Sequence, residues 1–192
     1  MTESPNEIAA WHSTSRQTLA ETKVFDLVKR QMRREGDDKE SDFFFVDAPD
    51  WVNVVALTDD DELVLIRQWR HARESVTLEI PGGTVDSGES PEDAAKRELL
   101  EETGYAARQW ARLGVIEPNP AILTNRCHTW LALGATREQE PAFEGNEHCV
   151  TELHPWTEAM KLVKSGAISH ALVVVALTYE TLRRVEPDSD EA

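Results

Sequence analysis

Cysteine is scarce in this chain. The 192 residues include only Cys127 and Cys149, and the two are not spaced as a CxxC pair. The sequence therefore contains no dithiol redox or zinc-ribbon motif. The six histidines form no HxH or HExxH pattern, which leaves a zinc site without support. We expect two reduced, partly buried thiols in a cytoplasmic protein.

Basic residues are also few. The chain has 20 Lys and Arg against 36 Asp and Glu, which gives a formal net charge of −16. Nucleic acids and anionic membranes require a basic surface, so we exclude both as main partners. A small anionic ligand is compatible with this charge, provided that metal ions lie between the ligand and the acidic side chains.

Long apolar runs and targeting signals are missing as well. The longest purely apolar run is Ala171–Leu177, whereas a membrane-spanning helix needs about 20 such residues. The first ten residues, MTESPNEIAA, lack the basic start and apolar stretch of a signal peptide. The polar ends, 1–9 and 186–192, are typical of frayed tails.

Apolar residues nevertheless suffice for a packed core, since 40% of the chain is hydrophobic. The length predicts one domain with at most a small additional subdomain. Strand-forming runs surround a central helix and two helices end the chain, which favours an α/β or α+β sandwich with helices on a mixed sheet. The run 24–32 also fits a helix. The expected strands are 23–32, 42–47, 51–57, 62–69, 76–80, 111–117, 126–134 and 149–153, and the expected helices are 91–103, 155–165 and 169–185.

The clearest helix has an N-cap at Ser90 and a terminating glycine at Gly104. Within it, Glu98 precedes Glu101 by three residues and Glu102 by four, so the three carboxylates project from one face. Like charges at this spacing cost about 0.2–0.5 kcal/mol per pair. Either this face is simply solvated, or a hard divalent cation binds its oxygens.

The segment 83–105 resembles the Nudix box, G-x5-E-x7-R-E-U-x-E-E-x-G-U, in which U is a bulky apolar residue. The resemblance implies a Nudix hydrolase with an α/β/α sandwich fold that binds divalent metal and cleaves a nucleoside diphosphate linked to another group. Every specified position is matched if Tyr105 is counted as the last U: Gly83, Glu89, Arg97, Glu98, Leu99, Glu101, Glu102, Gly104 and Tyr105.

The resemblance also implies a set of metal ligands, all of them oxygen donors. Glu98 and Glu102 would bind the metal directly, and Glu101 would bind it directly or through water. The carbonyl group of Gly82, just before the box, is a further implied ligand. The implied cofactor is Mg²⁺, for which Mn²⁺ can substitute.

Further catalytic roles follow from the same resemblance. Arg97 is expected to pair with Glu101 or with Glu89 and to hold the loop and the helix in shape. Glu147 aligns with a loop glutamate that serves as catalytic base or as an additional metal ligand in the family. Glu144 is the alternative for that role, and both residues also fit an ordinary acidic surface loop.

The whole chain resembles ADP-ribose pyrophosphatases and related nucleoside-diphosphate-sugar hydrolases. The sequence RQWR at 67–70 followed by LEIPGG at 78–83 is similar to an arrangement in that subfamily. Pro120, fifteen residues after Tyr105, and an N-terminal β-hairpin region before the core are further points of similarity. Members of the subfamily dimerise through that N-terminal region.

This subfamily resemblance implies four substrate-binding residues. Arg70 would bind phosphate, with Glu79 in the same motif, although an arginine on a sheet surface is the structural alternative. Trp51 or Trp11 would stack on the base, although either could instead lie in the core or in a dimer interface. The other four tryptophans are expected to pack in the core.

The sequence therefore predicts metal-dependent hydrolysis of the pyrophosphate bond of ADP-ribose or a nucleoside diphosphate sugar, carried out by a homodimer. The expected parts are a dimerisation subdomain at 1–48, a catalytic domain at 49–186 and a disordered acidic tail at 187–192. Two alternatives stay open. One is a Nudix pyrophosphatase for a dinucleotide or a damaged nucleoside triphosphate, and the other is a non-catalytic nucleotide sensor.

Overall fold

The computed structural model describes residues 8–143 and 148–185. The chain divides into two compact units, one formed by Met1–Pro49 with Glu117–Asn125 and the other by Asp50–Ile116 with Arg126–Ala192. The segment Glu117–Asn125, which the sequence analysis includes in the larger domain, thus groups with the N-terminal unit. No helix in the described ranges is long and apolar enough to cross a membrane.

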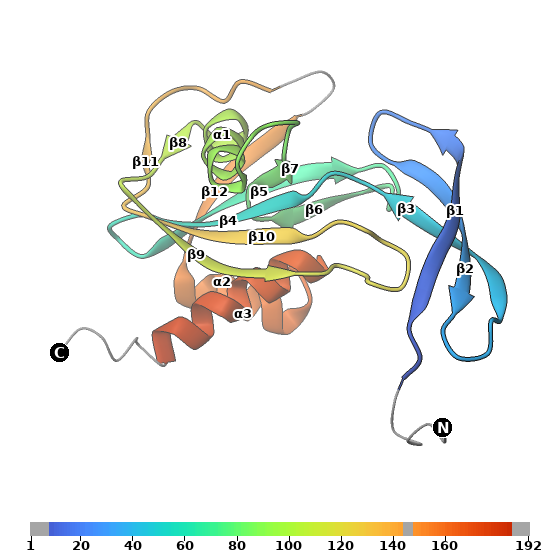
Figure 1. Cartoon of the computed structure of the whole chain (residues 1–192). Helices are drawn as coiled ribbons and strands as arrows, with labels where there is room; N and C mark the ends of the chain where they lie inside the picture. The colour runs from blue at the N-terminus through green and yellow to red at the C-terminus, as the bar shows by residue number, and fades with distance from the viewer. Residues whose placement is uncertain (1–7, 144–147, 186–192) are drawn as a thin grey trace. The chain divides into compact units, whose positions relative to one another are not determined.

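The first unit contains a three-stranded antiparallel sheet in the order β1-β2-β3 (Figure 1). Its strands are β1 (Trp11–Glu21), β2 (Asp26–Arg34) and β3 (Glu40–Asp47). The expected hairpin is confirmed, and the helical alternative for 24–32 is wrong. Strand β1 was not predicted, because its sequence WHSTSRQTLAE is mostly polar and exposed and lacks an alternating apolar pattern.

The second unit is built on a mixed sheet in the order β12-β5-β4-β10-β9, with β6 beside β5 and β7 beside β4. Strands β4 and β10 run parallel, and the other pairs are antiparallel. A separate short ladder joins β8 to β11. The strands are β4 (Trp51–Leu57), β5 (Glu62–Arg70), β6 (Ser75–Glu79), β7 (Gly82–Thr84), β8 (Tyr105–Ala106), β9 (Gln109–Ile116), β10 (Cys127–Leu133), β11 (Thr136–Arg137) and β12 (Cys149–Pro155).

Helices cover both faces of this sheet, with α1 on one side and α2 and α3 on the other (Figure 1). Strand β4 shows how the two cores are divided. Val52 and Val54 pack on the α1 side, whereas Val55 and Leu57 pack on the α2–α3 side, because successive strand residues point to opposite faces. The expected α/β/α sandwich is confirmed. The helices are α1 (Pro91–Thr103), α2 (Trp156–Ser165) and α3 (Ala171–Val185).

Local chemistry fixes both ends of α1, as the sequence predicts. The Ser90 hydroxyl accepts a hydrogen bond from the Asp93 N–H at 3.1 Å, and Pro91 occupies the first turn. At the other end Gly104 has a φ of 75°, and its N–H donates to the Leu100 carbonyl at 2.8 Å. The acidic part of α1 is therefore held between two fixed ends.

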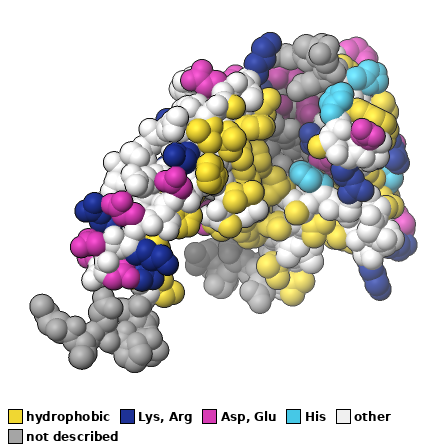
Figure 2. Space-filling view, turned by 90° about the vertical axis from the view of Figure 1, so that its right-hand side faces the viewer, with side chains coloured by type: hydrophobic (Ala, Val, Ile, Leu, Met, Phe, Trp, Pro, Cys, Tyr) yellow, Lys and Arg dark blue, Asp and Glu magenta, His cyan; other side chains and the backbone are white. Residues whose placement is uncertain are grey.

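Some apolar side chains reach the surface instead of the core (Figure 2). Trp69, expected to be a packing residue, is 51% exposed. On α3, Leu182 is exposed as well, because it lies five positions after the buried Leu177 and falls outside the helical repeat. Glu180 occupies the buried position instead and accepts hydrogen bonds from Arg183 and Arg184. The expectation that Trp69 packs in the core is therefore wrong.

The end of α1 generates a stability prediction. A Cβ at Gly104 would collide with the backbone carbonyl of Gln139, whereas a Cβ at Gly166, which ends α2 with a φ of 81°, would meet nothing within 4 Å. We expect Gly166→Ala to lower the free energy of unfolding by about 1–2 kcal/mol, through left-handed backbone strain alone. Gly104→Ala should lose more, because the 139–140 backbone must also move. Urea denaturation in EDTA measures the free energy of unfolding of both variants. Equal decreases in the two variants would contradict the steric argument.

Candidate functional site

The acidic face of α1 is packed against the chain just before the box. Glu98 and Glu102 are only 9% and 6% exposed, so the alternative of a solvated acidic face is wrong. The N–H of Gly82 donates to Oε2 of Glu102 at 2.8 Å. A Cβ at Gly83 would overlap the carboxylate of Glu98. The two carboxylates are therefore held beside the Gly82–Gly83 backbone.

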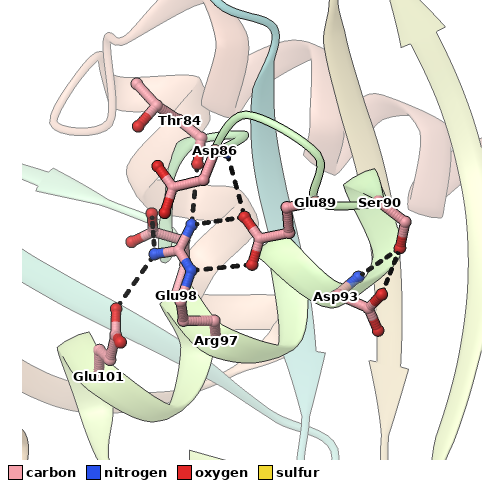
Figure 3. A network of polar contacts seen from close by, with 8 residues as sticks. All are labelled: Thr84, Asp86, Glu89, Ser90, Asp93, Arg97, Glu98 and Glu101. Atoms are coloured by element: carbon pink, nitrogen blue, oxygen red, sulfur yellow. Dashed lines mark hydrogen bonds and ion pairs between the residues drawn. The ribbon is translucent and has the colours of Figure 1, made fainter.

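Arg97 binds residues of both α1 and the preceding loop, 84–90, and so links the two (Figure 3). Its Nε and Nη2 each lie 3.0 Å from an oxygen of Glu89, and Nη2 also donates to the Thr84 carbonyl at 2.9 Å. Its Nη1 donates to Glu98 at 2.8 Å and to Glu101 at 3.1 Å. The sequence analysis expected Arg97 to pair with either Glu89 or Glu101, and the structure contains both contacts. Hydrogen bonding to Arg97 lowers the pKa of the Glu89 carboxyl.

The two glycines before the helix are required by close approach. Neither Gly82 nor Gly83 has a positive φ, although positive φ is one common reason for glycine in such a turn. A Cβ at Gly82 would collide with the carbonyl oxygen of Val52 on β4, and one at Gly83 would displace Glu98. Any side chain at these positions would therefore push the loop away from both the sheet and the carboxylates.

The donor set on α1 fits a hard divalent cation. Carboxylate and backbone carbonyl oxygens are the ligands that Mg²⁺ and Mn²⁺ take, and Glu98, Glu101, Glu102 and Gly82 supply them. Within residues 8–143 and 148–185, no three His, Cys, Asp or Glu side chains lie close enough together to hold a metal ion as they stand. Instead Arg97 bridges Glu98 and Glu101. Among the described residues, Glu98, Glu101, Glu102 and the Gly82 carbonyl are those that could hold a metal.

Arg70 and Glu79 form a second charged pair in the same unit. Nε and Nη2 of Arg70 lie 2.9 and 2.7 Å from the two Glu79 oxygens, and the Thr77 hydroxyl donates to Glu79 at 2.6 Å. Burial raises the pKa of Glu79, but hydrogen bonds from Arg70 and Thr77 outweigh it and the net pKa is lowered. The side chain of Glu79 is 2% exposed and that of Arg70 is 43% exposed. Solvent therefore reaches Arg70, and Glu79 positions it.

One residue near this pair escapes the sequence analysis. Nδ1 of His170 lies 3.2 Å from Oε2 of Glu79 but has no hydrogen-bond partner there. Burial lowers the pKa of the His170 imidazole. No motif or spacing connects His170 to Glu79, because the contact arises only when α3 packs on the sheet.

The two tryptophans proposed as base-stacking residues fall in different units. Trp51 begins β4 and is partly buried. Trp11 begins β1, where its ring meets Phe43 edge to face with centroids 5.4 Å apart, and the Arg34 guanidinium lies 5.8 Å from its centroid. Trp11 thus takes part in an aromatic cluster within the first unit.

Glu144 and Glu147 lie outside the described residues, but the chain on either side of 144–147 is attached to α1. The N–H of Ala142 donates to the Glu101 carbonyl at 2.8 Å. The Cys149 thiol lies 3.7 Å from Oε1 of Glu102 and donates to it. Both attachments are thus made at neighbouring residues of the acidic face. The sequence analysis missed the Cys149 contact, since no spacing rule links residues so far apart.

The chain matches a domain family, individual proteins and a solved structure. A model of the NUDIX domain matches residues 48–176. An ADP-ribose pyrophosphatase from Bacillus subtilis is 33% identical over 137 residues, which cover 70% of this chain and 74% of that protein. A methanol dehydrogenase activator from Bacillus methanolicus is 30% identical over similar shares, 70% and 74%. The crystal structure of an ADP compounds hydrolase matches with a TM-score of 0.79 at 23% identity, covering 92% of this chain and 96% of that one.

The Arg97 network predicts a pH-dependent stability effect. Arg97→Met should destabilise the protein by roughly 2 kcal/mol or more at pH 7, because charged hydrogen bonds are lost and three carboxylates then face one another. A carboxyl with a lowered pKa stabilises the fold above its usual pKa, and this contribution disappears as the pH falls through the lowered value. The difference between wild type and variant should therefore shrink below about pH 4.5.

Urea denaturation in EDTA at pH 7 and pH 3.5 measures this effect. The matched control is Lys96→Met, which removes an exposed ion pair with Glu92 from the same helix and should change stability by less than about 1 kcal/mol at either pH. A loss for Arg97→Met that is equal at both pH values, or no larger than that of the control, would refute the electrostatic account.

Proposed function

Because the chain belongs to the NUDIX domain family, we propose that it hydrolyses the pyrophosphate bond of ADP-ribose or another nucleoside diphosphate sugar. The products are a nucleoside monophosphate and a sugar phosphate. The observation that carries this proposal is the pair of buried carboxylates, Glu98 and Glu102, packed against the Gly82–Gly83 backbone. The similarity to an ADP-ribose pyrophosphatase over 70% of the chain supports the choice of substrate.

The proposed metal is Mg²⁺, for which Mn²⁺ can substitute. Its ligands are Glu98, Glu101, Glu102 and the Gly82 carbonyl, with Glu147 as an additional ligand. When bound, the cation neutralises charge on the diphosphate and lowers the pKa of water. Without a cation, the clustered carboxylates of α1 would repel a diphosphate. Substrate binding therefore depends on the cation.

The other parts of the substrate are assigned to residues outside the box. Arg70 is accessible and is held by Glu79, so its guanidinium can donate to a phosphate oxygen while Nε and Nη2 contact Glu79. Trp51 or Trp11 stacks on the base. Glu79 contributes by keeping Arg70 in place.

The proposed general base is Glu147, with Glu144 as the alternative. A base must lie within hydrogen-bond reach of the water whose proton it takes. Two hydrogen bonds support this assignment, from the Ala142 N–H to the Glu101 carbonyl and from the Cys149 thiol to the Glu102 carboxylate, because they hold both residues beside the end of α1 that carries the acids.

We also propose a homodimer formed through residues 1–48, and the cytoplasm as the compartment. Several large apolar side chains of the first unit are exposed, including Leu19, Phe25, Phe43 and Phe44, and a second copy could cover them. Both cysteines are free, which agrees with a reducing compartment.

A substrate panel tests the activity. We expect ADP-ribose, or one of ADP-glucose, UDP-glucose and GDP-mannose, to release nucleoside monophosphate with Mg²⁺ or Mn²⁺ and not with EDTA. Glu102→Gln should lower kcat by more than about 100-fold, beyond the 10–100-fold typical of residues that only support a ligand. The matched control is Glu92→Gln, an exposed acid in the first turn of the same helix.

Three results would overturn this proposal or part of it. Turnover restricted to a dinucleotide or an oxidised nucleoside triphosphate would favour the alternative substrate class. Absence of turnover on every nucleoside diphosphate derivative would favour a nucleotide sensor. An unchanged kcat in Glu102→Gln would refute the metal assignment.

The base assignment predicts a separate kinetic signature. Glu147→Gln should lower kcat more than it changes KM, because a base acts in the transition state, while Glu144→Gln should keep both values near wild type. Steady-state kinetics at saturating metal measure the two variants. A loss confined to Glu144→Gln would move the role to Glu144, and no loss in either variant would remove the base from this loop.

A further inference from the structure

We propose that Cys149 is a positioning residue for the metal site: its thiol holds the carboxylate of Glu102 in the orientation that binds the cation. This inference rests on the metal role proposed for Glu102. It goes beyond the box, because Cys149 is the first residue of β12 and lies outside residues 83–105.

Each oxygen of the Glu102 carboxylate accepts a hydrogen bond from a different residue. Oε2 accepts the Gly82 N–H at 2.8 Å, and Oε1 accepts the Cys149 thiol at 3.7 Å. The terminal torsion of a glutamate is broad and poorly fixed by its own rotamer preferences. A donor on each oxygen restricts rotation of the carboxylate plane, and both donors belong to residues on the sheet rather than on α1.

The chemistry of a thiol suits this position. A carboxylate oxygen has two lone pairs, so Oε1 can accept the S–H and still coordinate a metal. A thiol is a weak, uncharged donor, whereas Lys or Arg would place a competing positive charge beside the ligand. Valine would fill similar volume without donating. Cys149 is 6% exposed, so water does not readily replace the lost donor.

Glu102 and its neighbours on the helix have different hydrogen-bond donors. Glu98 and Glu101 share the guanidinium of Arg97. Glu102 accepts hydrogen bonds from the Gly82 amide and the Cys149 thiol, and neither of these two donors carries a charge. Loss of the thiol should therefore change the orientation of the Glu102 carboxylate without changing the local charge.

The test measures Mn²⁺ binding to the full-length protein without substrate, from the electron paramagnetic resonance signal of free Mn²⁺. Cys149→Val should weaken Mn²⁺ binding by about 10-fold, the lower end of the effect of removing a partner of a metal ligand. Cys149→Ser should bind Mn²⁺ more tightly than Cys149→Val, because its hydroxyl can also donate to Glu102. Its affinity should stay below that of wild type, because the hydroxyl reaches less far than the thiol. Cys127→Val is the matched control, since Cys127 is also a buried thiol on a strand of this sheet and should bind like wild type.

A second readout separates orientation from general damage. In Cys149→Val the Mn²⁺ concentration for half-maximal activity should rise, and kcat at saturating Mn²⁺ should return close to wild type. Circular dichroism melting checks that each variant is folded. Should the valine variant fail to fold, the serine variant carries the test, with Mn²⁺ binding between wild type and the Glu102→Gln protein.

Wild-type Mn²⁺ affinity in a folded Cys149→Val protein would overturn the proposal, as would equal weakening in Cys127→Val. Glu102→Gln separates this outcome from a failure of the proposed function. If that variant loses Mn²⁺ binding while Cys149→Val keeps it, the metal role of Glu102 stands and the role of the thiol falls. If Glu102→Gln binds Mn²⁺ like wild type, the metal assignment itself falls.

Discussion

The structure of the candidate site depends on keeping several like-charged carboxylates together in a partly buried place. Arg97 makes this arrangement stable, because one guanidinium reaches Glu89, Glu98 and Glu101 at once and also binds the Thr84 carbonyl. A planar fork with five donors can serve such a set, whereas a lysine ammonium cannot span it. The arginine therefore sets the position of the loop on the helix, and the loop in turn brings the glycine pair against the acids.

The C-terminal end of α1 is bound by residues 138–142 of the same unit. The last carbonyls of a helix lack partners within the helix. Here the N–H groups of Glu138 and Gln139 donate to the Gly104 carbonyl, and that of Ala142 donates to Glu101. Residues 138–142 thus satisfy carbonyl groups at the helix end and are held beside that end by the same hydrogen bonds. A change at Gly104 should therefore disturb both stability and the approach of the loop.

The sequence predicts the elements whose signals are local. The limits of α1 follow from Ser90 and Gly104, which act within one turn of the residues that they cap. The three-residue β7 and the two-residue β8 and β11 were missed, because the partner strand rather than their own sequence decides such short pairings. The position of Glu98 and Glu102 on one face of α1 was predictable from their spacing, and both are buried there. The Cys149–Glu102 contact was not predictable, because packing of β12 against α1 creates it.

The acidity of the chain acts differently at long and at short range. Exposed charges farther away than about 8 Å are largely screened at physiological ionic strength, so most of the net charge of −16 has little effect on a ligand at α1. The buried carboxylates Glu98 and Glu102 are screened much less. A divalent cation held there, as proposed above, would reverse the sign of the field that a diphosphate meets. A net charge that disfavours a nucleic-acid polymer, which needs a broad basic surface, is therefore compatible with the small diphosphate and the cation proposed above.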